Sequence, residues 1–301
     1  PYDWDALIAF LRARAIPGVE HVDARSYRRT IELGGVAGRI AVRPADVGPA
    51  LDLEVHFGEP RRLLAIVEGV RRVFDLGADP AVIASHLSGD ALLGPLLARH
   101  PGLRTPGAWD PFELAVRAIL GQQVSVAAAS TMAGRLAARF GAPGLAPDER
   151  LFPHPAALAQ APIEEIGVVR VRAEAIRALA RAAAEGGLPS SLQAIHGVGD
   201  WTEQYVALRA RGDTDAFPSG DLVLRRVAGV RTARELSERA EAWRPWRAYA
   251  VILLWQGACD DADRVVHRDR EPGRAAAPGR RRGRPAAAGL PRLAPRPPAS
   301  R

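Results

Sequence analysis

The chain has 301 residues, of which 48% are hydrophobic, and its formal net charge is +7. One cysteine and a complete lack of lysine exclude a disulfide framework, a cysteine-based zinc site, a four-cysteine iron–sulfur cluster and a Schiff base on lysine. No apolar run reaches the roughly 18 residues of a membrane span, and the start carries no signal-peptide pattern, so we expect a cytoplasmic globular protein.

The first part of the chain combines two helices with short alternating strands. Apolar spacing predicts helices over 4–14 and 59–74, and alternation predicts strands over 27–33, 38–43 and 51–57. The Gly34-Gly35 pair between the first two strands is typical of a tight hairpin turn. We therefore predict a small α+β domain, an antiparallel sheet with helices, over residues 1–85.

After residue 76 the pattern of strands ends and helical spacing takes over. Predicted helices cover 81–87, 91–98, 111–121, 126–140, 155–159, 163–166, 171–185, 201–211, 222–227, 233–242 and 246–257. This pattern indicates a mainly all-α region over residues 86–262, so the fold class is α+β. We expect two lobes, 111–213 and 86–110 with 214–262, and a cleft between them.

Residues 263–301 differ in composition from the rest of the chain. They contain 11 Arg against 3 acidic residues and are rich in Ala, Pro and Gly, which predicts a disordered basic tail. The remaining body carries 30 Arg against 31 acidic residues. Any nucleic-acid contact on the body must therefore be local, made by oriented backbone amides and a few arginines.

The segment 192–202 contains Gly197-Val198-Gly199 immediately before a predicted helix. A glycine turn at a helix start lets backbone amides approach a phosphate, and the helix dipole favours the negative charge. The pattern is typical of a helix-hairpin-helix that holds a DNA phosphate, and carbonyls of the same hairpin can hold a monovalent cation. The alternative is a plain corner between two helices.

Asp221 follows an apolar-Pro-Ser-Gly loop, residues 217–220. An Asp in this place is most often a helix N-cap. A carboxylate at a helix start is also stabilised in its ionised form by the helix dipole, so the cap and a functional role are compatible.

Three aromatic residues near these motifs allow two interpretations. Trp201 and Tyr205 are four residues apart and share a helix face, and Trp255 lies on a later predicted helix. Core packing is one interpretation. The other is a set of walls for an extruded base, where a cationic alkylated purine would gain a cation–π contact of about 0.5–2 kcal/mol.

A polar break, residues 121–125 (GQQVS), separates two apolar helices. It is either an ordinary turn with Ser125 as a cap, or a loop that enters DNA. In the second case Gln123 is the side chain that fills the space left by the extruded base.

Four motifs occur in order: 118–127 (AILGQQVSVA), 197–202 (GVGDWT), 217–221 (FPSGD) and 244–250 (RPWRAYA). With these motifs, the PYDW start and the α+β unit, the chain resembles the helix-hairpin-helix DNA glycosylases with a Gly/Pro-rich loop and terminal Asp (HhH-GPD). Within them it is similar to the DNA-3-methyladenine glycosylase II, AlkA-like kind. The resemblance covers residues 1 to about 262.

The resemblance implies roles for individual residues. Asp221 takes the position of the catalytic aspartate, with Gly220 where some relatives have a second Asp. Trp201 lies where bifunctional relatives have their Schiff-base lysine, and Tyr205 and Trp255 lie at pocket positions. The other implied positions are Gln123 at the wedge, Gly197, Val198, Gly199 and Thr202 at the DNA strand, and the Gln193, Ile195 and Val198 carbonyls around a Na⁺ or K⁺ ion.

The implied function is a monofunctional glycosylase that removes 3-methyladenine- or 7-methylguanine-type bases from double-stranded DNA. It acts as a monomer and requires no cofactor. The alternatives are a bifunctional glycosylase/lyase, a cluster-free adenine-mismatch or endonuclease-type relative, and a non-catalytic alkylation-sensing module. The missing initial Met favours a piece of a larger adaptive-response protein in the last case.

Overall fold

The computed structural model describes residues 1–268, with side chains described as far as residue 260. The chain divides into a compact unit, Pro1–Ala262, and a second unit, Asp263–Arg301. Of the second unit the structure describes only the end of helix α12, which runs from Arg247 to Arg268. The predicted tail therefore begins as helix, and the prediction of disorder for residues 269–301 lies outside the described residues.

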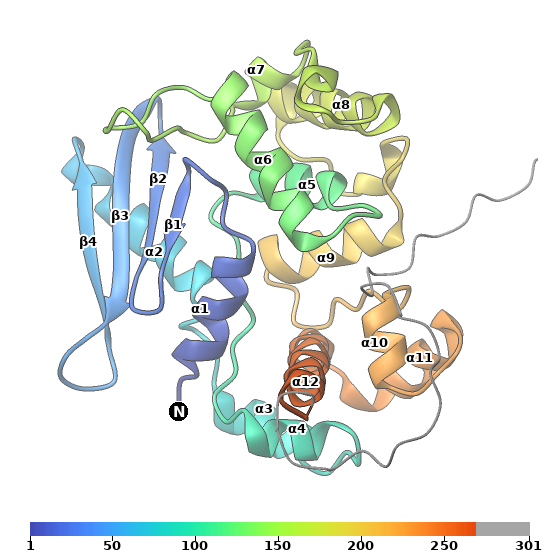
Figure 1. Ribbon diagram of the computed structural model, residues 1–301. Coiled ribbons are helices and arrows are strands. Elements are labelled where there is room, and N and C mark those ends of the chain that lie inside the picture. Colours follow the sequence, from blue (N-terminus) through green and yellow to red (C-terminus); the bar gives the residue numbers. More distant parts are fainter. Residues whose placement is uncertain (269–301) are drawn as a thin grey trace, which may run out of the picture. The chain divides into compact units, whose positions relative to one another are not determined.

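The N-terminal part is a four-stranded antiparallel sheet in the order β1-β2-β3-β4 with helices packed on it (Figure 1). Its elements are α1 (Trp4–Ala13), β1 (Glu20–Val22), β2 (Tyr27–Leu33), β3 (Val36–Pro44), β4 (Leu51–Phe57), the 3₁₀ turn η1 (Pro60–Arg62) and α2 (Leu63–Val73). Gly34 and Gly35 have φ of +64° and +80°, as the predicted hairpin turn between β2 and β3 requires. The sequence missed β1, because three residues are too few to show alternation.

The rest of the first unit is helical. Its elements are α3 (Pro80–Leu87), α4 (Leu93–Arg99), α5 (Pro111–Leu120), α6 (Val126–Phe140), α7 (Pro155–Leu158), η2 (Ile163–Ile166), α8 (Arg170–Gly186), η3 (Leu192–Ala194), α9 (Asp200–Ala210), α10 (Leu222–Val227), α11 (Ala233–Ala240), η4 (Glu241–Trp243) and α12. The predicted α+β fold class is confirmed. Among the described residues no helix is both long and apolar enough to cross a membrane.

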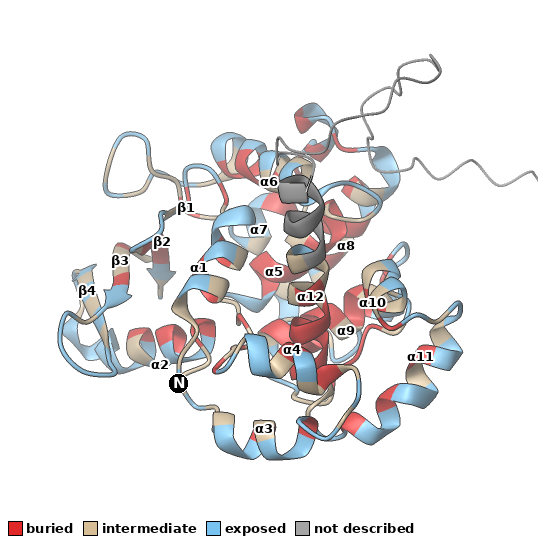
Figure 2. Ribbon diagram, turned by 60° about the horizontal axis from the view of Figure 1, so that its bottom comes forward, coloured by how far each residue is buried: buried red, intermediate tan, exposed pale blue. Residues whose placement is uncertain are grey.

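Three hydrophobic cores organise the unit. One lies between the sheet, α1 and α2, a second among α5, α6, α8 and the start of α9, and a third among α3, α4, α10, α11 and α12. Ile83 and Leu87 of α3 belong to the third core. Figure 2 shows buried residues concentrated along α5, α9 and the first turns of α12.

Helix α9 is shared between two of these cores. Tyr205 and Val206 pack in the second core, and Ala207 and Leu208 pack in the third. A helix buried on both sides cannot leave its polar side chains unpaired. Glu203 accordingly pairs with Arg211 at 2.6 Å, and Arg209 donates to the backbone carbonyls of Pro106 and Gly107 at 2.7 and 3.0 Å.

A buried ionic network joins the sheet to α5. Arg29 of β2 contacts Glu113 at 2.7 Å, and Arg117 contacts both Glu113 and Glu20 at 3.1 and 3.2 Å. Burial alone would raise the pKa of Glu20, but Arg117 and Arg29 lower it below its usual value. The charges therefore compensate one another, which fixes α5 against the N-terminal domain.

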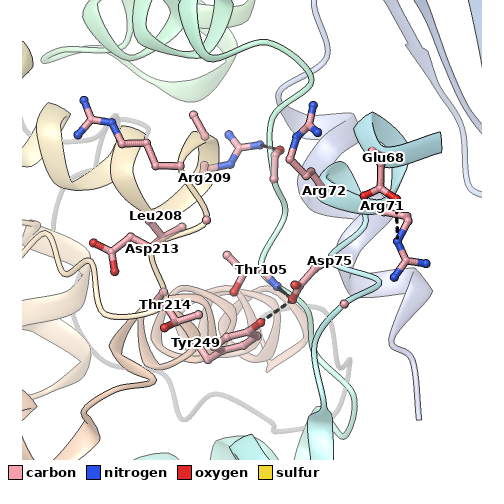
Figure 3. Close-up of a pocket in the computed structure, with 16 residues that line it drawn as sticks. Glu68, Arg71, Arg72, Asp75, Thr105, Leu208, Arg209, Asp213, Thr214 and Tyr249 are labelled. Carbon is pink, nitrogen blue, oxygen red and sulfur yellow. Dashed lines mark hydrogen bonds and ion pairs between the residues drawn. The ribbon is translucent and has the colours of Figure 1, made fainter. Parts of the chain in front are cut away.

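Asp75, which follows α2, forms a second link between the N-terminal part and the helical region. It lies beside a cavity of about 320 Å³ lined by α2, α9 and α12 (Figure 3). The Asp75 carboxylate accepts hydrogen bonds from the Thr105 N–H at 3.0 Å and the Tyr249 hydroxyl at 2.9 Å. Burial nevertheless raises its pKa above the usual value. Its φ of +50° lies in the left-handed region, which Asn and Asp tolerate better than most residues.

Asp75→Asn should therefore stabilise the protein at neutral pH. Because the folded state raises the pKa of Asp75, the wild type loses stability as pH rises above the unfolded pKa, and the amide does not. The Tm difference between variant and wild type should grow from pH 4 to pH 7.5 and reach a few degrees. A difference that stays constant with pH would show that ionisation of Asp75 carries no cost.

Candidate active site

A cavity of about 500 Å³ lies among α5, α6, α9, α10, α12 and the end of α1. Trp201, Tyr205 and Trp255 line it, together with Asp221, and we call it the aromatic cavity. These four residues come from three separate segments of the sequence. The structure therefore brings together the predicted aromatic residues and the predicted carboxylate, and α9 supplies Trp201 and Tyr205.

Asp221 is held from two sides. Its Oδ1 caps α10 by accepting from the Val223 and Leu224 N–H groups at 2.8 and 3.0 Å. Its Oδ2 accepts from the indole Nε1–H of Trp201 at 2.9 Å. The N-terminus of α10 also favours negative charge at this position. The carboxylate is thus fixed in orientation, with Oδ2 on the side of the aromatic wall.

The loop before Asp221 is anchored in the third core. Phe217 is 5% exposed, packs edge-on against Trp243 with ring centroids 5.9 Å apart, and donates its N–H to the Gln204 side chain at 3.0 Å. The Asp221 N–H then closes a turn onto the Pro218 carbonyl at 2.9 Å. This turn fixes the position of Asp221 in the wall of the cavity.

The aromatic rings form a continuous surface. Trp201 and Tyr205 are stacked with centroids 5.0 Å apart and an interplanar angle of 11°, and Trp255 follows at 6.2 Å from Tyr205. Phe10 of α1 stacks on Trp255 at 6.5 Å. Flat apolar faces in this arrangement suit a flat ligand.

Three arginines surround the Tyr205 hydroxyl. Arg209 donates to it at 2.6 Å, and Arg14 and Arg117 line the aromatic cavity nearby. Burial would raise the pKa of Tyr205, but Arg209, Arg14 and Arg117 lower it below its usual value. Arg14 also lies over the Phe10 ring at 3.6 Å from its centroid. The part of the cavity near the Tyr205 hydroxyl is therefore polar and rich in donors.

The segment 192–199, which we call the glycine hairpin, is fixed by apolar anchors. Leu192, Ile195 and Val198 are 1%, 7% and 7% exposed and pack in the second core. The Val198 N–H donates to the Ile195 carbonyl at 3.0 Å, and Gly197 takes φ of +88°. A Cβ on Gly199 would meet nothing within 4 Å, so the backbone is open to an approaching group there.

The polar break at residues 121–125, which we call the Gln–Gln loop, projects beside the glycine hairpin. Gln123 is exposed with φ of +56°, and Ser125 caps α6 by accepting from the Ala128 N–H at 3.2 Å. The Gln122 side chain donates to the Gly197 carbonyl at 3.0 Å and to the Thr202 hydroxyl at 3.3 Å. Thr202 itself is 2% exposed, so its side chain lies beneath the surface.

Sequence reasoning did not single out Arg14, Arg117 or Gln122. Phe10 and Arg14 are four residues apart on a predicted helix, but nothing in that spacing indicates that their partners lie on α9 and α12. Gln122 is adjacent to Gln123, which the sequence did single out. Only the structure shows that Gln122, and not Gln123, contacts Gly197.

Comparison with known proteins gives two family matches: AlkA N-terminal domain over residues 1–110, and HhH-GPD superfamily base excision DNA repair protein over residues 116–244. The chain is 36% identical over 278 residues to DNA-3-methyladenine glycosylase 2 of Escherichia coli (strain K12), covering 85% of this chain and 94% of the relative.

It is also 37% identical over 273 residues to the probable bifunctional transcriptional activator/DNA repair enzyme AlkA of Mycobacterium tuberculosis (strain CDC 1551 / Oshkosh). That match covers 85% of this chain and 55% of the relative, so the chain spans about half the length of the mycobacterial protein. A solved 3-methyladenine DNA-glycosylase from Archaeoglobus fulgidus shares the fold, with a TM-score of 0.74, 23% identity, and coverage of 85% and 95% of the two chains.

The Trp201–Asp221 hydrogen bond predicts a difference between two Trp→Phe variants. Trp201→Phe keeps the stacking on Tyr205 but removes the donor to a carboxylate, and should lower the free energy of unfolding by about 1–2 kcal/mol. Trp255→Phe is the matched control, because its indole N–H donates no hydrogen bond found among the described residues. Urea unfolding measures both, and equal losses would mean that the bond to Asp221 contributes nothing.

Proposed function

The chain belongs to the HhH-GPD superfamily of base excision DNA repair proteins and carries an AlkA-type N-terminal domain, and we propose that it is a monofunctional DNA glycosylase. Its substrates are alkylated purines of the 3-methyladenine and 7-methylguanine type in double-stranded DNA, and its product is an abasic site. The single observation that carries the proposal is the Asp221 carboxylate, held by Trp201 and the start of α10 at the wall of the aromatic cavity.

The aromatic cavity suits an extruded base. Flipping a base costs a few kcal/mol of lost stacking, and aromatic walls restore part of it. Trp201, Tyr205 and Trp255 supply such faces, and an alkylated purine that carries positive charge gains a further cation–π contact.

The chemistry follows from the charge of the substrate. When the bond from C1′ to the base nitrogen breaks, its electron pair stays on the base, so a cationic base leaves as a neutral molecule and needs no strong acid. The sugar then carries positive charge, which the Asp221 carboxylate stabilises. A water oxygen adds to C1′, and Asp221 accepts the proton that this water loses.

The glycine hairpin and the N-terminus of α9 form the grip on the DNA strand. Backbone N–H groups at a helix N-terminus bind phosphate, and the open space at Gly199 lets the strand approach the backbone. Gln123, exposed at the tip of the Gln–Gln loop, fills the space that the extruded base leaves.

The backbone carbonyls of Gln193, Ile195 and Val198 are the groups that would hold a Na⁺ or K⁺ ion. Carbonyl oxygens are hard ligands that suit such cations. Outside the regular helices of the described chain, no hydrogen bond to the Gln193 or Val198 carbonyl is found, while the Ile195 carbonyl accepts the Val198 N–H at 3.0 Å and has a second lone pair for an ion. A bound ion would add positive charge beside the phosphate.

The Asp221→Asn variant tests the proposal. Asn caps a helix about as well as Asp, so the fold should persist, while base release falls by about 100-fold or more. The assay is single-turnover release of 7-methylguanine from a defined duplex, with DNA affinity measured in parallel and expected to stay within about twofold.

Unchanged base release in that variant would remove Asp221 from the reaction. Intact DNA binding by a wild type that releases no base would support the non-catalytic sensing module.

We also propose that the protein has no lyase activity. The printed chain has no lysine, and the aromatic residue Trp201 lies on the cavity wall beside Asp221. Borohydride added during turnover should therefore trap no covalent enzyme–DNA adduct, while a lysine-dependent glycosylase run alongside should give one. An adduct would support the bifunctional reaction.

A further inference from the structure

The Gln–Gln loop and the glycine hairpin are joined by one side chain. Gln122 Nε2 donates to the Gly197 carbonyl at 3.0 Å and to the Thr202 hydroxyl at 3.3 Å. Among the described residues these are the only hydrogen bonds found between the loop and the segment 192–202. The two surfaces that would meet DNA are thus connected through a single amide.

Both acceptors of Gln122 are themselves fixed. Gly197 is at the apex of the glycine hairpin with φ of +88°, and a Cβ there would lie 3.7 Å from Val171. Thr202 is 2% exposed in the first turn of α9. Gln122 therefore bonds to fixed groups of the glycine hairpin and of α9, and these groups determine its own position.

The neighbouring residue needs such support. Gln123 has φ of +56°, a region that side chains longer than Asn or Asp seldom adopt and that costs of order 1 kcal/mol or more. Gln123 is exposed, so it has little packing of its own to hold it. Fixing the preceding residue is the direct way to keep its backbone in this conformation.

We propose that Gln122 is a positioning residue that locks the Gln–Gln loop to the glycine hairpin, so that insertion of Gln123 into the duplex is coupled to the grip on the strand. This inference rests on the proposed function. Without this contact the Gln–Gln loop can move away from the glycine hairpin when the DNA duplex resists extrusion of the base. The extruded base then returns to the stack. Gln122 does not touch the base, so its effect depends on how hard the base is to extrude.

The test compares two duplexes that differ only in the cost of extrusion. One carries 7-methylguanine paired with cytosine, and the other carries it opposite an abasic-site analogue, where there is no pairing to break. Gln122→Ala should slow single-turnover base release from the paired lesion by about tenfold and from the unpaired lesion by about twofold or less. A purely structural role would lower both rates by the same factor.

Three further variants sharpen the result. Gln122→Glu keeps the shape but replaces the donor with a carboxylate facing the Gly197 carbonyl, so it should show the same selective loss. Thr202→Val removes one acceptor with little change in volume and should give an intermediate loss that is not additive with Gln122→Ala. Gln160→Ala, an exposed glutamine between α7 and η2, is the matched control and should match the wild type on both duplexes.

Equal loss on both duplexes, or no loss on either, overturns the proposal. A wild type that releases no base from either duplex instead overturns the proposed function, so the two failures are distinguishable. Thermal unfolding of each variant confirms that the comparison is made between folded proteins.

Discussion

Helix α9 lies between two hydrophobic cores, and much of the candidate site depends on that placement. The glycine hairpin precedes it, its first two turns carry Trp201 and Tyr205, and Ala207 and Leu208 near its end pack in the third core. A helix buried on both sides cannot shift without disturbing both cores, because interiors are close-packed. The glycine hairpin, the aromatic wall and the contact to Asp221 are therefore held at fixed distances from one another along one helix.

The cost of burying α9 is that each polar group on it needs a partner. Glu203 pairs with Arg211 and accepts the Leu192 N–H, which ties the helix to the start of the glycine hairpin. Arg209 donates to the Pro106 and Gly107 carbonyls, which ties α9 to the segment between α4 and α5, and it also donates to the Tyr205 hydroxyl. The groups that pair with the polar side chains of α9 thus also hold the residues of the aromatic cavity in position.

The sequence predicts what short motifs encode and misses what distant segments make together. The order of elements follows from local spacing, and the cap at Asp221 follows from an Asp at a helix start, as its bonds to Val223 and Leu224 confirm. Arg14 is different, because its place in the aromatic cavity arises only when the end of α1 meets α9. No local sequence pattern predicts that contact between the end of α1 and α9.

Asp221 illustrates how one side chain can stabilise the fold and still be available for the proposed chemistry. Oδ1 is occupied by the backbone of α10, which belongs to the third core, and Oδ2 is bonded to Trp201 of α9, which packs against the second. The carboxylate thus links the two cores and also caps α10. Any change in how those cores meet would move Oδ2 relative to the aromatic wall. The position of the Asp221 carboxylate is therefore set by the packing of the whole helical region, and residues far from the cavity can alter it.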